Sequence, residues 1–138
     1  MTVSVSSEII RQVRARARDR CQFCRMHQSL QGATFHVEHV IPMSAGGTSD
    51  PSNLVLACPS CNLHKSNRID AADPESGKSV RLFHPLNDTW RDHFEWQEFS
   101  VVGRTAEGRA TASALRLNEP RRLKIRQAEA QFDLFPPV

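Results

Sequence analysis

The spacing of apolar residues divides the first half of the chain into helical and extended segments. Over residues 6–19 apolar side chains recur every three or four positions after a serine and an acid, which predicts a helix. Residues 34–40 and 53–57 are short runs rich in β-branched and other apolar side chains and predict two strands. Glycine, proline and serine crowd residues 42–51, which are therefore predicted to form a loop. A short helix is expected over residues 61–68.

The second half of the chain predicts another set of elements. Residues 70–78 are polar and turn-prone, and we place a boundary between two segments there. An alternating strand over residues 79–83 leads into an aromatic stretch that we expect to be partly extended. Residues 103–108 begin and end with glycine and are interpreted as a hairpin turn. Two helices are expected after it, over residues 109–117 and 119–132.

The composition limits the size of the core. The chain has 138 residues, of which 39% are hydrophobic and 7% aromatic, so we expect one small domain that a bound metal would help to stabilise. The N-terminus lacks a charged segment followed by a long apolar one, and no stretch approaches the ~18 apolar residues of a membrane span. We therefore expect a soluble, intracellular and cytoplasmic protein that does not contact a membrane.

Four cysteines form two pairs of the type Cys-x2-Cys, one at Cys21 and Cys24 and the other at Cys58 and Cys61. Two such pairs are the ligand set of a closed, tetrahedral zinc site. Disulfide bonds are the alternative, but pairs this regular in a chain without a secretion signal favour zinc in a reducing compartment. Because a zinc ion with four thiolates has no open position, we expect one structural zinc that does no chemistry.

The segment between and beside the cysteine pairs carries side chains suited to hydrolysis. Glu38 and His39 are adjacent in a predicted strand, and Asn62 follows the last cysteine directly. A carboxylate and an amide oxygen are ligands for Mg²⁺ or Mn²⁺, and a histidine, which titrates near pH ~6.5, is a competent base for water. Each residue alone has an ordinary explanation as an exposed histidine, an asparagine cap or a glutamate paired with an arginine. Their shared position against the same cysteine pairs favours a catalytic site.

The order and spacing of these residues resemble the HNH endonuclease family over about residues 18–68. The resemblance implies a ββα-metal core, an α+β fold in which two antiparallel strands and a helix surround one divalent cation. It also implies hydrolysis of phosphodiester bonds in DNA. The matching positions are the two cysteine pairs, the run His36-Val-Glu-His-Val-Ile-Pro42, Gly46-Gly47, Asn53-Leu54, and Asn62 with Lys65.

The resemblance implies a role for each matched residue. His39 is implied as the general base that activates water. Glu38 stands where the family usually has aspartate and, with Asn62, is implied to hold the catalytic Mg²⁺, Mn²⁺ or similar ion. Asn53 is implied to fix the histidine and the loop by hydrogen bonding. Lys65 matches a basic position that is suited to contact phosphate.

Other basic residues are candidates for contact with the site or with nucleic acid. His36 precedes Glu38 by two residues on the same strand face, so it either lines the site or has no role there. Arginines gather over residues 11–20, and arginines with a lysine over residues 116–126, in a chain of net charge +3. Such clusters either neutralise phosphates or form solvated helix faces. The candidates that we select for nucleic-acid contact are Arg11, Arg14, Arg18 and Arg68.

We expect two parts. The first is a nuclease module over residues 1–69, which is stabilised by zinc and includes the basic helix, and the second is an extension over residues 70–138. The extension is expected to contain a β-hairpin and helices and to pack on the module through its aromatic residues. A base-stacking surface beside Arg91, Arg104 and Arg109 is the alternative for those aromatics. Two other functions stay open, a non-catalytic zinc-stabilised nucleic-acid-binding module and a protein-interaction domain. Cutting both DNA strands with one site per chain favours a homodimer or sequential nicking.

Overall fold

The computed structural model describes residues 5–137, and its first helix forms where the sequence predicted it. α1 spans Ser7–Ala17, and the side-chain oxygen of Ser6 caps it by accepting a hydrogen bond from the backbone N–H of Ile9. The helix ends because Arg18 takes a left-handed conformation with φ of 53°. This end delivers the chain directly to the first cysteine pair.

Two strands and a helix form the centre of the first half, in the order that the resemblance implied. β1 (His36–His39) pairs antiparallel with β2 (Leu54–Ala57), and α1 packs against β2. α2 (Pro59–Lys65) follows, with Cys58 as its N-cap. The second cysteine pair is therefore built into the first turn of the helix. Short 3₁₀ helices occupy the connections, namely η1 (Gln28–Leu30), η2 (Met43–Ala45) and η3 (Pro51–Asn53).

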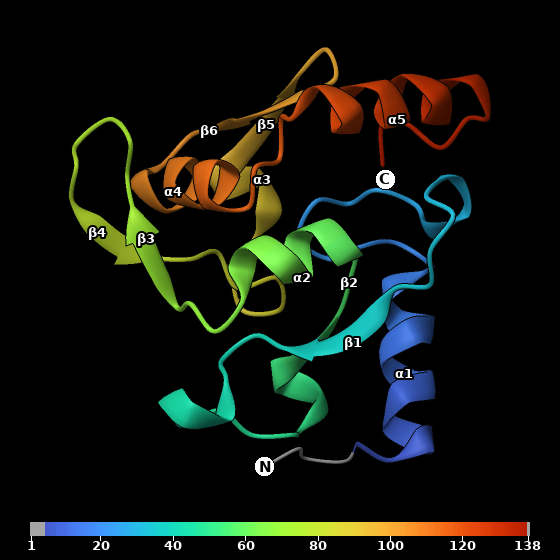
Figure 1. The fold of residues 1–138 in the computed structure, drawn as a ribbon, viewed down its shortest axis with the longest axis vertical. Coiled ribbons are helices and arrows are strands. Elements are labelled where there is room, and N and C mark those ends of the chain that lie inside the picture. Colours follow the sequence, from blue (N-terminus) through green and yellow to red (C-terminus); the bar gives the residue numbers. More distant parts are fainter. Residues whose placement is uncertain (1–4, 138) are drawn as a thin grey trace.

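The second half adds two antiparallel hairpins and further helices, and the whole has the mixed helix and strand class that was predicted (Figure 1). β3 (Asp70–Ala72) pairs with β4 (Ser79–Arg81), and β5 (Phe94–Gln97) pairs with β6 (Ser100–Gly103). In Figure 1 the β5–β6 hairpin lies above α2, and β1 lies below it. The helices of this half are α3 (Trp90–His93), α4 (Ala106–Ala114) and α5 (Pro120–Gln131).

The structure differs from two expectations for the second half. Residues 70–72 form β3 and residues 73–78 connect it to β4, so the boundary that we placed at residues 70–78 falls within a hairpin. Gly103 and Gly108 do not frame a turn, because the first ends β6 and the second lies inside α4. A Cβ on Gly108 would collide with the backbone oxygen of His93, and one on Gly103 with the backbone of Arg109. The two glycines mark close packing of a strand against a helix.

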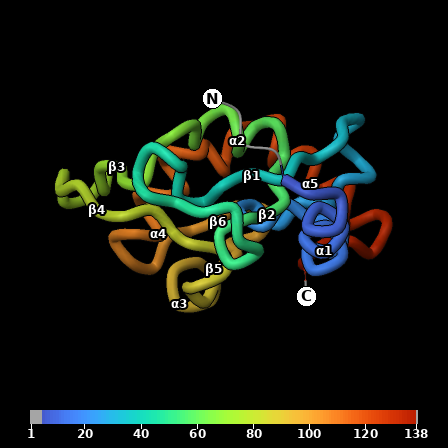
Figure 2. The backbone as a smooth tube through the Cα atoms, turned by 90° about the horizontal axis from the view of Figure 1, so that it is seen from below, coloured from blue at the N-terminus to red at the C-terminus, as the bar shows by residue number. Residues whose placement is uncertain are grey.

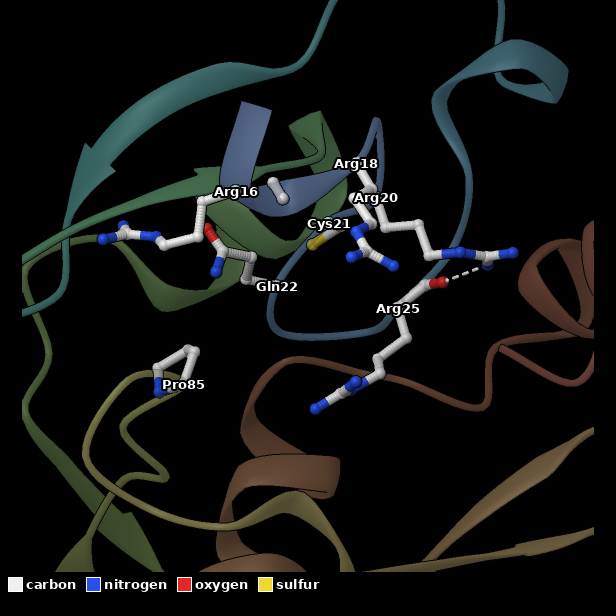
Figure 3. A pocket seen from close by; sticks show the side chains of 8 residues that line it. Arg16, Arg18, Arg20, Cys21, Gln22, Arg25 and Pro85 are labelled. Atoms are coloured by element: carbon white, nitrogen blue, oxygen red, sulfur yellow. Dashed lines mark hydrogen bonds between the residues drawn. The ribbon is translucent and has the colours of Figure 1, made fainter. Parts of the chain in front are cut away.

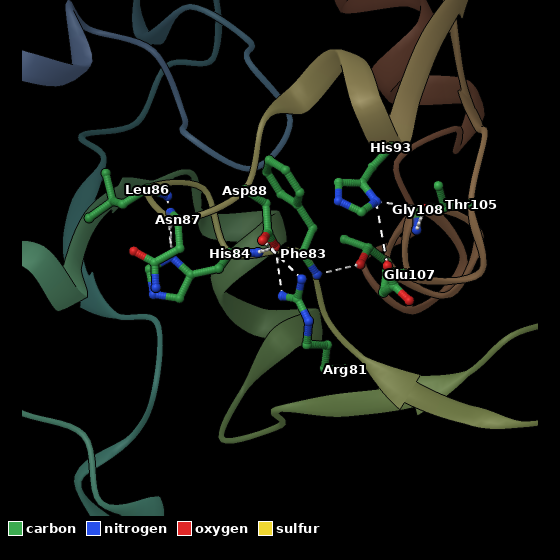
Figure 4. Close-up of polar contacts among 11 residues, drawn as sticks. Arg81, Phe83, His84, Leu86, Asn87, Asp88, His93, Thr105, Glu107 and Gly108 are labelled. Carbon is green, nitrogen blue, oxygen red and sulfur yellow. Dashed lines mark hydrogen bonds and ion pairs between the residues drawn. The ribbon is translucent and has the colours of Figure 1, made fainter.

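A polar network joins the segment after β4 to α4 (Figure 4). The guanidinium of Arg81 donates to both carboxylate oxygens of Asp88, at 2.7 and 2.9 Å, and lowers the pKa of that carboxyl. Asp88 also accepts a hydrogen bond from the backbone N–H of His84 at 2.8 Å. The backbone N–H of Phe83 donates to the hydroxyl of Thr111 at 2.9 Å. These polar groups are engaged in holding the fold.

One apolar core runs through both halves of the molecule. Phe35 and Leu56 of the first half and Phe83, Phe94 and Leu115 of the second are buried in the same cluster. Figures 1 and 2 both place α1 and the β3–β4 hairpin at opposite ends of the molecule. Within residues 5–137 no helix is long and apolar enough to cross a membrane.

Candidate metal centre and catalytic site

The four cysteines converge on one buried point. Cys21 and Cys24 come from the turn after α1, and Cys58 and Cys61 come from the start of α2. Their sulfur atoms all lie within 4.8 Å of one another, and the sulfurs of Cys24 and Cys58 are 3.8 Å apart. A tetrahedron with Zn–S bonds of about 2.3 Å has edges of about 3.8 Å, so the cluster has the size of a zinc site. All four are free thiols and not disulfides.

Arg122 of α5 reaches this cluster from the second half of the chain. Its side chain is 2% exposed, and one guanidinium nitrogen donates to the sulfur of Cys61 at 3.0 Å and to that of Cys58 at 3.5 Å. The other nitrogen donates to the backbone oxygen of Leu115 at 2.9 Å. Burial alone would lower the pKa of Arg122, but the negative charge of Cys24 and its partners raises it above the usual value.

The position of Arg122 corrects the interpretation of the second basic cluster. Neither a phosphate contact nor a solvated helix face describes Arg122 or Arg126, because both are buried. Arg126 donates to the backbone oxygens of Phe99 and Leu117 at 2.9 and 2.8 Å. Zn²⁺ with four thiolates carries a net charge of about −2, and a buried charge of that size is costly without a partner. Arg122 supplies part of the opposite charge and ties α5 to the metal ligands.

Replacing Arg122 with methionine is expected to weaken both zinc retention and folding. The change keeps the volume but leaves the thiolates without their cation, and breaking one partner of a buried charge pair costs roughly 3–5 kcal/mol. We expect faster transfer of zinc to a chromophoric chelator and a lower unfolding temperature. Arg121→Met, one residue away and exposed, is the matched control. Equal rates of zinc transfer for the two variants would contradict this role of Arg122.

Three of the residues implied by the resemblance line one open cavity. Glu38 and His39 at the end of β1 face this cavity together with Asn62 of α2. The cavity has a volume of about 380 Å³. Because α2 begins on two zinc ligands, the cysteine cluster fixes the helix that carries Asn62 next to the strand that carries Glu38.

The imidazole of His39 is held by Ser49. The Nε2 atom of His39 lies 3.0 Å from the hydroxyl oxygen of Ser49, which belongs to the loop between β1 and β2. Within residues 5–137 the Nδ1 atom makes no hydrogen bond. Ser49 was not singled out from the sequence, because serine is common in loops and no spacing marked this one.

Asn53 organises the loop that carries Ser49. Its amide oxygen accepts from the backbone N–H of Ile41 at 2.9 Å, and its amide nitrogen donates to the backbone oxygens of Ile41 and Thr48 at 2.9 and 2.8 Å. A Cβ on Gly47 would collide with the same Ile41 oxygen, so a glycine is required where the loop crosses β1. Asn53 therefore holds the loop and does not contact the His39 ring.

Two further candidates do not line this cavity. His36 is exposed and lies outside the residues that form it. Lys65 is only 4% exposed, and burial lowers the pKa of its ammonium group. Its Nζ atom has no hydrogen-bond partner among the described residues, and the side chain lines a separate cavity of about 170 Å³. The charge of Glu38 partly offsets this lowering of the Lys65 pKa, but Lys65 is not among the residues that line the Glu38 cavity.

The four arginines selected for nucleic-acid contact divide into two kinds. Arg14 donates to the backbone oxygen of Phe35 at 2.7 Å, and Arg68 donates to the backbone oxygens of His64 and Ala114. Arg16 is exposed and also donates to the backbone oxygens of Pro51 and Leu54. Arg11 and Arg18 are exposed. Arg68 is exposed as well, and for all four arginines nucleic-acid contact stays a prediction.

Comparison with known proteins gives one match. Residues 21–68 match the family model described as HNH endonuclease, a span that runs from the first zinc ligand past the end of α2. No curated protein and no solved structure matches the chain. The matched span contains all four cysteines and every residue of the Glu38 cavity.

Proposed function

We propose that this protein is a metal-dependent endonuclease that hydrolyses phosphodiester bonds in DNA, since residues 21–68 match the HNH endonuclease family model. The observation that carries the proposal is the convergence of Glu38, His39 and Asn62 on one open cavity. A zinc-binding module that served only as a scaffold would not need a carboxylate, an imidazole and an amide in this arrangement.

In the proposed reaction His39 accepts a proton from the attacking water. We assign the tautomer in which Nε2–H donates to the Ser49 hydroxyl oxygen, so that Nδ1 keeps its lone pair. The hydrogen bond fixes the ring, and Nδ1 is the atom left free to take the proton. Asn53 contributes by holding the loop on which Ser49 lies.

The side chains of Glu38 and Asn62 fit one hard divalent cation such as Mg²⁺ or Mn²⁺. The Glu38 carboxylate has no arginine or lysine within 4.0 Å among the described residues, which removes the alternative that it serves as an ordinary ion pair. Two protein oxygens leave the remaining positions for water and for phosphate oxygens of the substrate. When bound, such an ion stabilises the charge that develops on the phosphate and the leaving oxygen.

Two exposed apolar side chains at the edge of this cavity support a large substrate. Met43 is 49% exposed and Leu63 is 72% exposed, and both line the cavity beside the proposed catalytic residues. Exposed apolar side chains gathered at one site mark a contact surface, and DNA sugars and base edges offer apolar partners. We propose that Met43 and Leu63 contact the DNA on either side of the scissile phosphate.

Cleavage of supercoiled plasmid DNA with and without added divalent ions tests this function. We expect nicking with Mg²⁺ or Mn²⁺ and none without them. Glu38→Gln removes the charge at constant size, so it is expected to raise the ion concentration needed for half-maximal rate by about 10-fold or more. Glu8→Gln, an exposed acid in α1, is the matched control. A wild-type protein that binds DNA but never cuts it with any ion would instead support a non-catalytic nucleic-acid-binding module.

A further inference from the structure

An arginine-lined pocket lies beside the first cysteine pair (Figure 3). It has a volume of about 450 Å³ and shares no residue with the Glu38 cavity. No carboxylate is among its lining residues, whereas four arginines are, namely Arg16, Arg18, Arg20 and Arg25. A concave surface with this many guanidinium groups and no acid is suited to an anion.

Two guanidinium groups of this pocket are held in place by hydrogen bonds, but little of the positive charge there is neutralised by carboxylates. Arg16 and Arg20 donate to backbone carbonyls, which orient the guanidinium groups without cancelling their charge. Among the described residues, Glu129 is the one acid within ion-pair distance of these arginines, 4.0 Å from Arg20. The Nε atom of Arg25 is buried and has no hydrogen-bond partner among the described residues. Burial and the charge of Arg20 both lower the pKa of Arg25. A lowered pKa of this kind is expected for a partly buried cation that has no anionic partner.

An aromatic pocket adjoins the arginine pocket, and Arg25 lines both. The second pocket has a volume of about 530 Å³, with Trp90 and Trp96 in its wall. The two indole rings are stacked, with centroids 5.1 Å apart, and the Arg25 guanidinium lies 5.5 Å from the centroid of the Trp90 ring. The Arg126 guanidinium and the Phe135 ring lie against Trp96, so a ligand meets the part of the pair that lines the pocket. The indole N–H of Trp90 is buried and unpaired among the described residues. Arg91, Arg104 and one acid, Glu95, also line this pocket.

We propose that the two pockets together bind one nucleotide unit of a single-stranded nucleic acid, with a phosphate among the arginines and a base in the aromatic pocket. An anion joined to a flat, hydrogen-bonding ring matches both pockets, and Arg25 at their junction faces both parts. Arg25 lines both pockets, so its guanidinium can donate to a phosphate while it lies over the Trp90 ring. A duplex does not fit, because its bases are stacked inside and cannot reach the indole rings.

This second site goes beyond the proposed cleavage reaction and is tested without it. The chain has two tryptophans, and both line the aromatic pocket, so their intrinsic fluorescence reports a bound base directly. Without added divalent ion, an oligothymidine of about 10 nucleotides is expected to quench this fluorescence, and the same length of duplex is not. Binding to the oligothymidine should be tighter than to thymidine monophosphate, because neighbouring phosphates add contacts. Equal affinity for the two would assign the site to a free nucleotide instead of a strand.

Variants of the two pockets separate this site from a general charge effect. Arg25→Gln is expected to weaken binding of a labelled oligothymidine by about 10-fold and to lower the salt dependence by about 0.7 in the log–log slope. Trp96→Leu, followed by anisotropy of the label, should weaken binding by a similar factor. The matched controls are Arg121→Gln and Phe132→Leu, which are exposed and line neither pocket.

A variant of a second arginine in the pocket guards against misfolding of the Arg25→Gln protein. Arg18→Gln changes an exposed residue of the same pocket, so it keeps the test valid if Arg25→Gln folds poorly by circular dichroism and zinc content. We expect weaker binding in the Arg18, Arg25 and Trp96 variants and wild-type binding in both controls. Absence of quenching by the single strand, or an equal loss in Arg121→Gln, would overturn the proposal.

Discussion

Replacing Cys58 with serine is expected to unfold the first half of the protein. Cys58 is one of the four metal ligands and also the N-cap of α2, where its sulfur accepts from the backbone N–H of Cys61 at 3.4 Å. Structural zinc contributes about 10–16 kcal/mol of apparent binding free energy in small domains, as much as or more than the ~5–15 kcal/mol that separates most folded proteins from the unfolded state.

The Cys58→Ser protein is checked by far-ultraviolet circular dichroism, thermal unfolding and zinc content per chain. We expect loss of cooperative unfolding and less than one zinc per chain. Ser60→Ala lies in the same knuckle but supplies no ligand, so it controls for a change of sequence at this turn and should fold like the wild type. A zinc-free Cys58→Ser protein that unfolds at the wild-type temperature would refute a structural four-cysteine site.

Replacing His39 with alanine is expected to slow DNA cleavage by roughly 100- to 10,000-fold, the usual contribution of general base catalysis. His39 lines the Glu38 cavity and is half-buried on the edge strand β1, so its removal leaves the zinc cluster and the apolar core in place. We therefore expect wild-type zinc content and wild-type DNA binding together with the loss of rate. The measurement is the rate of plasmid nicking at saturating Mg²⁺ or Mn²⁺.

Two variants sharpen the assignment of His39. Ser49→Ala removes the hydroxyl that holds the ring and is expected to cost about 10-fold, less than loss of the base itself, because the imidazole keeps its chemistry and loses only its orientation. His64→Ala removes another histidine of the matched span that does not line the cavity, and it should cut at the wild-type rate. Nicking by His39→Ala at the wild-type rate would place the base elsewhere.

The sequence was sufficient to predict the elements whose signals are local. The helix after Ser6, the two short strands and the cysteine pairs each have a pattern that does not depend on the rest of the chain. The convergence of Glu38 with Asn62 also followed, because two zinc knuckles fix the ends of the segment between them. These features cover the span that the family model matches.

The sequence did not predict the features that depend on long-range contacts. Arg122 and Arg126 look like surface charges in the sequence, and only the packing of α5 on the cysteine cluster explains their burial. β3 has no strand pattern of its own and is held by its pairing with β4 and by Asp73, whose carboxylate accepts two hydrogen bonds from Arg109 at 2.9 Å. The Ser49 hydroxyl reaches His39 through a loop path that no spacing reveals.

The central claim is that two metals divide the work, with zinc in the cysteine cluster and a second ion at Glu38 and Asn62. The most direct measurement combines metal content with activity on one sample. Protein that carries one zinc per chain, freed of loosely bound ions, is mixed with supercoiled plasmid before and after Mn²⁺ is added. The account predicts no cutting before the addition, cutting after it, and one zinc per chain throughout. Cutting by the zinc-only protein at the same rate would contradict it.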